Sequence, residues 1–217
     1  MRIAYLTQSY TPMISGAAPV VENLANGMAG SGHQVLVIAA SDKGQTYAVQ
    51  DGSLSVLRLK SRHNPTRVGQ RYVLYPRRAV LKALREFKPD IIHAHEPLPM
   101  SLPGIIYAGR ERIPILLTVH QLPSSTVKYL PHSLQRAGES ILYVYARWYT
   151  EKFTSIIAPT ETTSSEVKKI LGRTVNIISN GIDLQAFRPH LPGENESAIR
   201  QKWDLPLDVP ILLHVGR

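Results

Sequence analysis

Short apolar runs alternate with amphipathic stretches along most of the chain, and this alternation predicts its secondary structure. In the stretches between the runs, apolar residues recur at the three- and four-residue spacing of a helix. Residues 47–60 instead resemble a hairpin that turns at Asp51–Gly52. Strands are predicted for residues 2–7, 32–40, 90–95, 114–120, 154–160 and 174–179, and helices for 19–31, 76–88, 102–112, 133–152 and 161–171.

Strands that alternate with helices indicate right-handed βαβ units and a mostly parallel sheet. The predicted fold class is therefore α/β, a Rossmann-like sandwich with a parallel sheet. Such sheets bind ligands at the carboxyl ends of their strands, so the loops after the strands matter most. These loops are residues 8–18, 93–100, 120–131, 159–162 and 179–185.

The first of these loops, "YTPMISGAAP", has small residues at positions 15 to 18 and leads into a predicted helix. Small residues let a ligand approach the backbone, and a helix N-terminus attracts an anion such as a phosphate. The loop lacks both the G-x-G-x-x-G pattern and a P-loop lysine. A tight turn between strand and helix with no ligand is the competing interpretation.

Three histidines stand at or near the ends of predicted strands. His93 and His95 are two residues apart, Glu96 follows them, and His120 ends the next strand. Three histidines could bind zinc, but histidines at strand ends more commonly line a polar pocket or form fixed hydrogen bonds. We expect no metal, and we regard His120 either as a pocket residue or as a cap on its strand.

The composition excludes several classes of protein. The chain has no cysteine, so it forms no disulfide and no thiolate metal site. No apolar run approaches the length that crosses a bilayer. We expect a cytoplasmic protein, or one peripheral at the inner face of the membrane.

The net charge of +9 is concentrated in one part of the sequence. Between Arg58 and Lys88 there are ten basic residues and one acid, Glu86. The predicted helix over 76–88 carries half of these cations, beside an apolar stripe of Val80, Leu84 and Phe87. Its basic residues are Arg77, Arg78, Lys82, Arg85 and Lys88.

This helix has two interpretations: an ordinary solvated surface, or a face that docks on anionic membrane, where each cation contributes about 1 kcal/mol. The window has no recognised nucleic-acid-binding module, so we predict no nucleic-acid partner.

Six segments of the chain form a pattern together: "SGAAPVVENLANGMAGSGHQVLVIA", "KPDIIHAHEPLPMSL", "IPILLTVHQLP", "IIAPTETTSSEVKKI", "VNIISNGIDLQAFRP" and "PILLHVGR". They resemble the N-terminal half of a retaining family 4 glycosyltransferase with the GT-B fold, and the resemblance covers the whole chain. In addition, "HEP" with the basic helix resembles the members that glycosylate lipids, such as the phosphatidylinositol mannosyltransferases.

The resemblance implies three regions. Residues 1–187 would be the acceptor-binding domain, 188–208 an interdomain linker with a short helix, and 209–217 the first strand of a C-terminal donor-binding domain. The rest of that donor domain is expected to be missing, so the chain by itself is expected to be inactive. Transfer would run from a nucleotide-diphosphate sugar to an acceptor hydroxyl, such as that of a membrane lipid, without cofactor or metal.

The resemblance also implies roles for individual residues. His120 would act at the transferred sugar, and Gly16 and Ala17 would lie near the donor phosphate. The family usually has Gly-Gly in this loop, so the Cβ of Ala17 would crowd the phosphate. Acceptor-binding residues would be Tyr10, His95, Glu96, Ser125 and Lys128, residues of the interdomain cleft Asn180 and Gly181, and membrane-facing residues Arg77, Arg78, Lys82 and Arg85.

Two other functions remain open at this stage. The chain could be a non-catalytic basic α/β module that binds anionic membrane or another polyanion. A dinucleotide-dependent dehydrogenase fits poorly, because the glycine fingerprint and the acid after the second strand are absent. The sequence does not specify the sugar, the nucleotide, the acceptor or the oligomeric state.

Overall fold

The computed structural model describes residues 1–65, 69–96, 99–120, 131–182, 184, 187–188 and 196–214. The chain divides into two compact units, Met1–Gly181 and Ile182–Arg217. The domain boundaries expected after residues 187 and 208 stay predictions.

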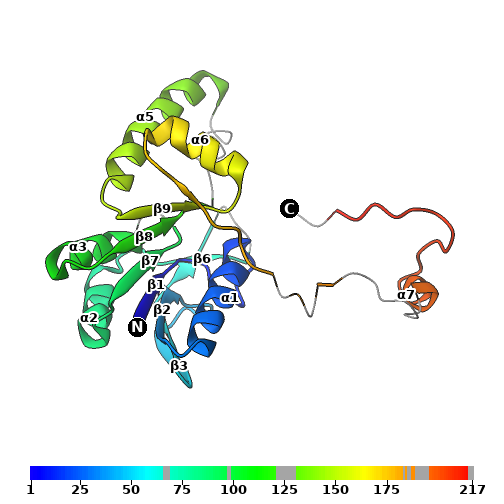
Figure 1. Cartoon of the computed structure of the whole chain (residues 1–217), viewed down its shortest axis with the longest axis horizontal. Coiled ribbons are helices and arrows are strands. Elements are labelled where there is room, and N and C mark those ends of the chain that lie inside the picture. The colour runs from blue at the N-terminus through cyan, green and yellow to red at the C-terminus, as the bar shows by residue number, and fades with distance from the viewer. Residues whose placement is uncertain are drawn as a thin grey trace. The chain divides into compact units, whose positions relative to one another are not determined.

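The N-terminal unit is built on an eight-stranded sheet with the order β10-β9-β8-β7-β1-β2-β4-β3 (Figure 1). All neighbouring strands run parallel except β3, which pairs antiparallel to β4. The predicted α/β class with a mostly parallel sheet is therefore confirmed. The strands are β1 Arg2–Leu6, β2 Gln34–Ala40, β3 Tyr47–Asp51, β4 Leu54–Leu59, β7 Ile91–Ala94, β8 Ile115–Thr118, β9 Ser155–Ala158 and β10 Asn176–Ile177.

The central strands are nearly continuous apolar runs because helices cover both faces of the sheet. Successive residues of β1 point to opposite faces, so Tyr5 joins one core and Leu6 the other. Helix α1 (Ala17–Gly30) packs on the Tyr5 face. Helices α2 (Arg77–Phe87) and α3 (Ser101–Glu111) cover the Leu6 face.

Two further helices lie near β9, at the end of the sheet that β10 borders. Helix α5 (His132–Thr150) contributes Tyr149 to the Leu6 core, and α6 (Glu161–Leu171) packs on β9. The predicted N-cap of α6 is confirmed, because the Thr160 hydroxyl accepts a hydrogen bond from the backbone N–H of Thr163 at 3.2 Å.

The structure departs from the predicted elements in the basic window. A two-stranded antiparallel sheet, β5 (Arg62–His63) and β6 (Arg71–Tyr72), was not expected there. Two residues per strand are too few to leave an alternating pattern in the sequence. The expected strand over 174–179 is also shorter, since only β10 pairs with β9.

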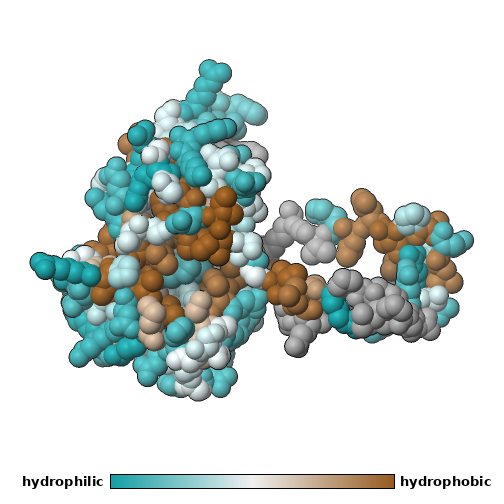
Figure 2. All heavy atoms as spheres, viewed as in Figure 1, coloured by the Kyte–Doolittle hydropathy of each residue, from teal (hydrophilic) through white to brown (hydrophobic). Residues whose placement is uncertain are grey.

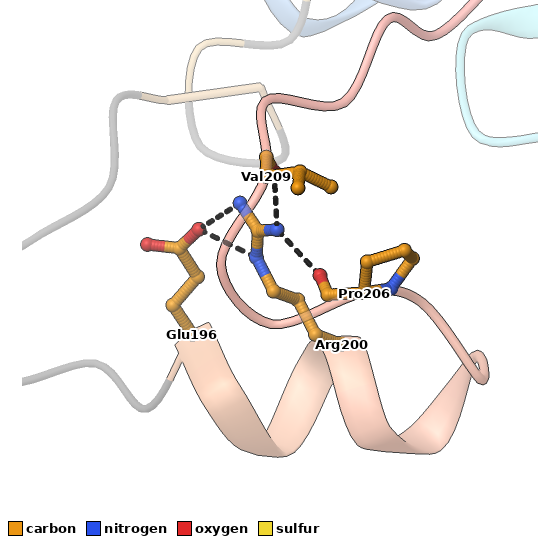
Figure 3. A network of polar contacts seen from close by, with 4 residues as sticks. All are labelled: Glu196, Arg200, Pro206 and Val209. Carbon is orange, nitrogen blue, oxygen red and sulfur yellow. Dashed lines mark hydrogen bonds and ion pairs between the residues drawn. The ribbon is translucent and has the colours of Figure 1, made fainter.

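The C-terminal unit contains helix α7 (Glu196–Lys202), as expected of the linker region. The Arg200 side chain bonds Glu196 one turn earlier and donates to the carbonyls of Pro206 and Val209 at 2.7 and 2.9 Å (Figure 3). Residues 210–214 form no strand, and apolar side chains along 205–214 are exposed (Figure 2). The strand expected over 209–217 stays a prediction.

Within the described residues, no helix combines the length and the apolar character that crossing a membrane requires.

Candidate functional site

The strand order places a ligand-binding crevice beside β1. Strand β1 has β2 on one side and β7 on the other, so the chain reverses its direction of winding between β1 and β7. The loops that leave two such strands diverge and open a crevice at their carboxyl ends. The first loop, from Gln8 to Ala17, and the residues His95 and Glu96 meet at this point.

A pocket of about 630 Å³ occupies the crevice. Its polar wall comes from the first loop, the β5–β6 sheet and the ends of β7, β8 and β10. The residues of this wall are Gln8, Ser9, Ser15, Gly16, Ala17, Asn64, Gln70, Arg71, Tyr72, His95, Glu96, His120 and Asn180.

The opposite wall is mainly apolar and comes largely from α5 and α6. The site therefore joins a polar end, at the strand termini, to an apolar end beneath two helices. The residues of this second wall include Leu117, Val119, Leu142, Tyr145, Ala146, Tyr149, Val167, Ile170 and Leu171.

His95 and His120 face each other in the polar wall. His95 Nδ1 lies 3.1 Å from His120 Nε2, and the two rings stack with centroids 5.4 Å apart. His95 is 1% exposed, and among the described residues its other ring nitrogen, Nε2, has no hydrogen-bond partner. The two histidines that the sequence singled out at neighbouring strand ends thus form one unit.

Burial keeps the histidines of this cluster uncharged near neutral pH. Burial lowers the pKa of His93 to about 4, with a smaller contribution from His120. Burial, then His93 and His120, hold the pKa of His95 well below its usual range, and burial also lowers the pKa of His120. A neutral imidazole can exchange hydrogen bonds with a ligand hydroxyl without placing a charge beside it.

His93 supports this arrangement from outside the pocket. Its Nε2 is 2.8 Å from the Thr118 hydroxyl, and its ring centroid is 4.2 Å from that of His95. Within the described part of the chain, no group of three His, Cys, Asp or Glu side chains is arranged to hold a metal ion.

Glu96 lines the pocket, but its carboxylate is directed to the first loop. The backbone N–H groups of Gln8 and Ser9 donate to it at 2.9 and 3.3 Å. Gln8 in turn bonds both backbone groups of Val73, its Oε1 accepting from the N–H at 3.1 Å. Glu96 thereby holds together the two loops that form the crevice, a role that its sequence position did not suggest.

Gly16 and Ala17 lie in the pocket wall at the start of α1, and their expected place beside the donor phosphate stays a prediction. Gly16 has φ −62°, a conformation open to any residue, and a Cβ added there would meet nothing within 4 Å. The backbone conformation at Gly16 therefore does not require glycine. The lack of a side chain there leaves space for a ligand in the pocket.

Tyr10 is not among the residues that line the pocket, and its expected role in acceptor binding stays a prediction. It is 5% exposed and belongs to the core under α1. The guanidinium of Arg58 lies 4.8 Å from its ring centroid and donates to the carbonyls of Tyr10 and Thr11. An aromatic residue between a strand and a helix buries its ring where a core is available.

The other predicted site residues fall into three groups. Asn180 lines the pocket, whereas Gly181 is the last residue of the N-terminal unit and does not. Ser125 and Lys128 lie outside the described residues. The basic side chains of α2 are exposed, while Val80, Leu81 and Leu84 of the same helix are buried.

Sequence reasoning missed the part of the site that the β5–β6 sheet supplies. Asn64, Gln70 and Arg71 line the pocket. Arg71 is fixed by its Nε, which donates to the Ser61 hydroxyl at 2.9 Å, and by an Nη1 contact to His63 Nε2 at 2.6 Å. Arg71 is one of ten cations in its window, and only the pairing of β5 with β6 distinguishes it from the others.

Residues 14–186 match the family described as Glycosyltransferase Family 4. An alpha-monoglucosyldiacylglycerol synthase from Acholeplasma laidlawii is 28% identical over all of this chain and 56% of its own length. A GDP-mannose-dependent alpha-mannosyltransferase from Mycobacterium tuberculosis is 29% identical over the same shares. The chain thus spans about half the length of the curated relatives it matches.

A sucrose-phosphate synthase from Thermosynechococcus elongatus has a similar fold, with a TM-score of 0.66 at 17% identity. The match covers all of this chain and 56% of that one. The catalytic domain of starch synthase IV from Arabidopsis thaliana matches with a TM-score of 0.56 at 17% identity, over 97% of this chain and 60% of that domain. These likenesses confirm the predicted fold, the N-terminal half of GT-B.

Proposed function

The chain belongs to glycosyltransferase family 4, and from this premise we propose that it is the acceptor-binding domain of a retaining glycosyltransferase. The reaction would move a sugar from a nucleotide-diphosphate sugar to an acceptor hydroxyl. The observation that carries the proposal is the convergence of the first loop, Glu96 and the His95–His120 pair on one pocket at the switch point of the sheet.

The proposed chemistry uses groups that this pocket contains. His120, neutral and half-buried, would bond a hydroxyl of the sugar or the acceptor, and His95 would fix its ring. Gly16 and Ala17, at the N-terminus of α1, would face the negative charge of the leaving diphosphate. We propose no metal ion and no cofactor, because helix N-termini and cations can stabilise that charge.

A lipid acceptor is proposed from two observations. One relative is by name a synthase of a glycosylated diacylglycerol, and the pocket has an apolar wall beside its polar end. Arg77, Arg78, Lys82 and Arg85 of α2 are exposed and would hold the protein on an anionic membrane. Asn180 would lie where the acceptor domain faces the donor domain.

The test is transfer of labelled sugar from nucleotide-diphosphate sugars to diacylglycerol in vesicles. The 217-residue chain alone is expected to give no transfer, whereas a longer product of the same reading frame is expected to be active. In that product His120→Ala should reduce transfer at least a hundredfold, as loss of a positioned catalytic group does.

Replacement of the exposed His132 by alanine is the matched control and should leave transfer unchanged. Unchanged transfer in His120→Ala would remove His120 from the site. Vesicle binding by a longer product that transfers no sugar from any donor would favour the non-catalytic module instead.

A further inference from the structure

Helix α5 exposes an apolar stripe that none of the described residues of its own unit covers. Leu134, Ile141, Val144 and Trp148 are 55%, 69%, 70% and 51% exposed. Their spacing, together with the exposed Ala137, places them along one side of the helix. A surface helix ordinarily has polar residues on its outer side, so the stripe requires an explanation.

The inner side of the same helix forms part of the pocket. Leu142, Tyr145, Ala146 and Tyr149 line the apolar wall, so α5 has one face toward the site and another toward the outside. A helix with its side chains is about 10 Å across. Whatever covers the stripe therefore lies about one helix diameter from the apolar end of the pocket.

Cations accompany the stripe. Arg136 and Arg147 are exposed on the helix, and the Lys152 ammonium lies 5.6 Å from the Trp148 ring centroid. Aliphatic and tryptophan side chains next to Lys and Arg are typical of helices that lie in a membrane interface, where the cations meet lipid phosphates.

A second basic surface lies over the same face of the sheet. Val80 and Leu84 of α2 and Tyr149 of α5 belong to one core cluster, and the exposed side of α2 carries Arg77 and Arg78. Both helices therefore cover the face of the sheet opposite α1. A second copy of the chain would fit the spacing of the stripe, but its net charge of +9 repels these cations, whereas an anionic bilayer attracts them.

We propose that the outer face of α5 inserts its apolar stripe into the surface of a bilayer that contains anionic lipid. The inference deepens the proposed function, on which it rests for the lipid acceptor. The insertion itself is measurable without any sugar transfer. The protein would then contact the membrane in two ways. The apolar side chains of α5 insert into the bilayer, and the cations of α2 are attracted to its negative charge.

The chain has two tryptophans, so Trp203→Phe leaves Trp148 as the only tryptophan reporter on the protein. Vesicles of phosphatidylcholine and phosphatidylglycerol are expected to shift the Trp148 emission to the blue, and bromine near the glycerol end of the acyl chains should quench it. Cosedimentation with an unshifted, unquenched Trp148 would overturn the insertion while leaving membrane attachment through α2 intact.

The second variant is Ile141→Gln with Val144→Gln, which keeps the helix because glutamine is a good helix former. Its partition into these vesicles should fall roughly tenfold or more. Val49→Gln, at an exposed apolar position on β3, is the control and should bind as the parent does.

Equal binding by the double variant and its parent would contradict the proposal. So would a parent dimer in sedimentation that the double variant converts to a monomer, because that result assigns the stripe to a second copy. His120→Ala should lose transfer in the longer product and keep the quenching of Trp148 in the Trp203→Phe chain, which separates failure of the proposed reaction from failure of the insertion.

Discussion

His95 Nδ1 and His120 Nε2 lie 3.1 Å apart, although the residues are 25 positions apart in the chain and follow different strands. The parallel pairing of β7 with β8 brings their strand ends together. One nitrogen donates and the other accepts, so the pair requires at least one neutral ring. Burial supplies that condition, since it lowers the pKa of both side chains.

The histidine cluster should make stability depend on pH. The pKa of His93 is about 4 in the folded chain against 6.5 for the free side chain, so the unfolded state binds the proton first as the pH falls. The contribution of uncharged His93 to the unfolding free energy is fully present above pH 6.5. About 3 kcal/mol of that free energy should be lost by pH 4. Urea unfolding across this range measures the loss.

His93→Asn removes the titrating group and keeps a polar partner for Thr118. The difference in unfolding free energy between the parent and this variant should shrink as the pH falls. A difference that is constant from pH 7 to pH 4 would show that His93 binds its proton equally well in both states.

Glu96→Gln should loosen the crevice. The amide keeps an oxygen but loses the charge that strengthens the bonds from Gln8 and Ser9, so the unfolding free energy should fall by about 1–2 kcal/mol. Glu86→Gln, at an exposed position of α2, should change it by less than about 0.5 kcal/mol. Equal losses of unfolding free energy in the two variants would contradict the role of Glu96 in holding the two loops of the crevice together.

Gly104 and Gly109 of α3 offer a matched pair. A Cβ at Gly104 would lie 2.4 Å from Leu6 Cδ1, within a core where Leu6 is fully buried, whereas one at Gly109 would meet nothing within 4 Å. Gly104→Ala should therefore destabilise by about 1–3 kcal/mol. Gly109→Ala should be neutral or stabilise by up to about 1 kcal/mol. Thermal unfolding measures both variants, and a Gly109→Ala variant less stable than Gly104→Ala would contradict this packing of α3.

Arg58 should be needed for the shape of the first loop. Arg58→Met removes the donor to the carbonyls of Tyr10 and Thr11 and the cation beside the Tyr10 ring, which should cost about 2–3 kcal/mol. Arg62→Met, at an exposed position of β5, is the control. Hydrogen exchange of the amides from Ser9 to Ala18 should increase only in the Arg58 variant.

The basic face of α2 should govern attraction to anionic vesicles. Arg77→Glu with Arg78→Glu removes two cations, so partition should fall roughly thirtyfold or more at low salt. Lys168→Glu with Lys169→Glu makes the same charge change on the exposed side of α6 and should have a smaller effect. Similar losses in the two variants would mean that net charge, and not α2, attracts the membrane.

The sequence by itself determined the alternation of strands and helices, because a strand buried on both faces must be an apolar run and a covering helix must be amphipathic. It also determined that His95, Glu96 and His120 follow strands of a parallel sheet, and therefore that they lie at its ligand-binding edge. The apolar stripe of α2 could be predicted in the same way, because the spacing of its apolar residues is a property of one short segment.

Only the tertiary structure decided what those side chains contact. The β7–β8 pairing joins His95 to His120, the separation of β7 from β2 by β1 opens the crevice, and Glu96 is directed to backbone groups 87 and 88 residues earlier. Arg71 became a pocket residue through a pairing two residues long, and Tyr10 turned inward to a core that residues of β1, α1, β2 and β4 share. Contacts of this kind depend on strand order and packing, which the local pattern of one segment does not encode.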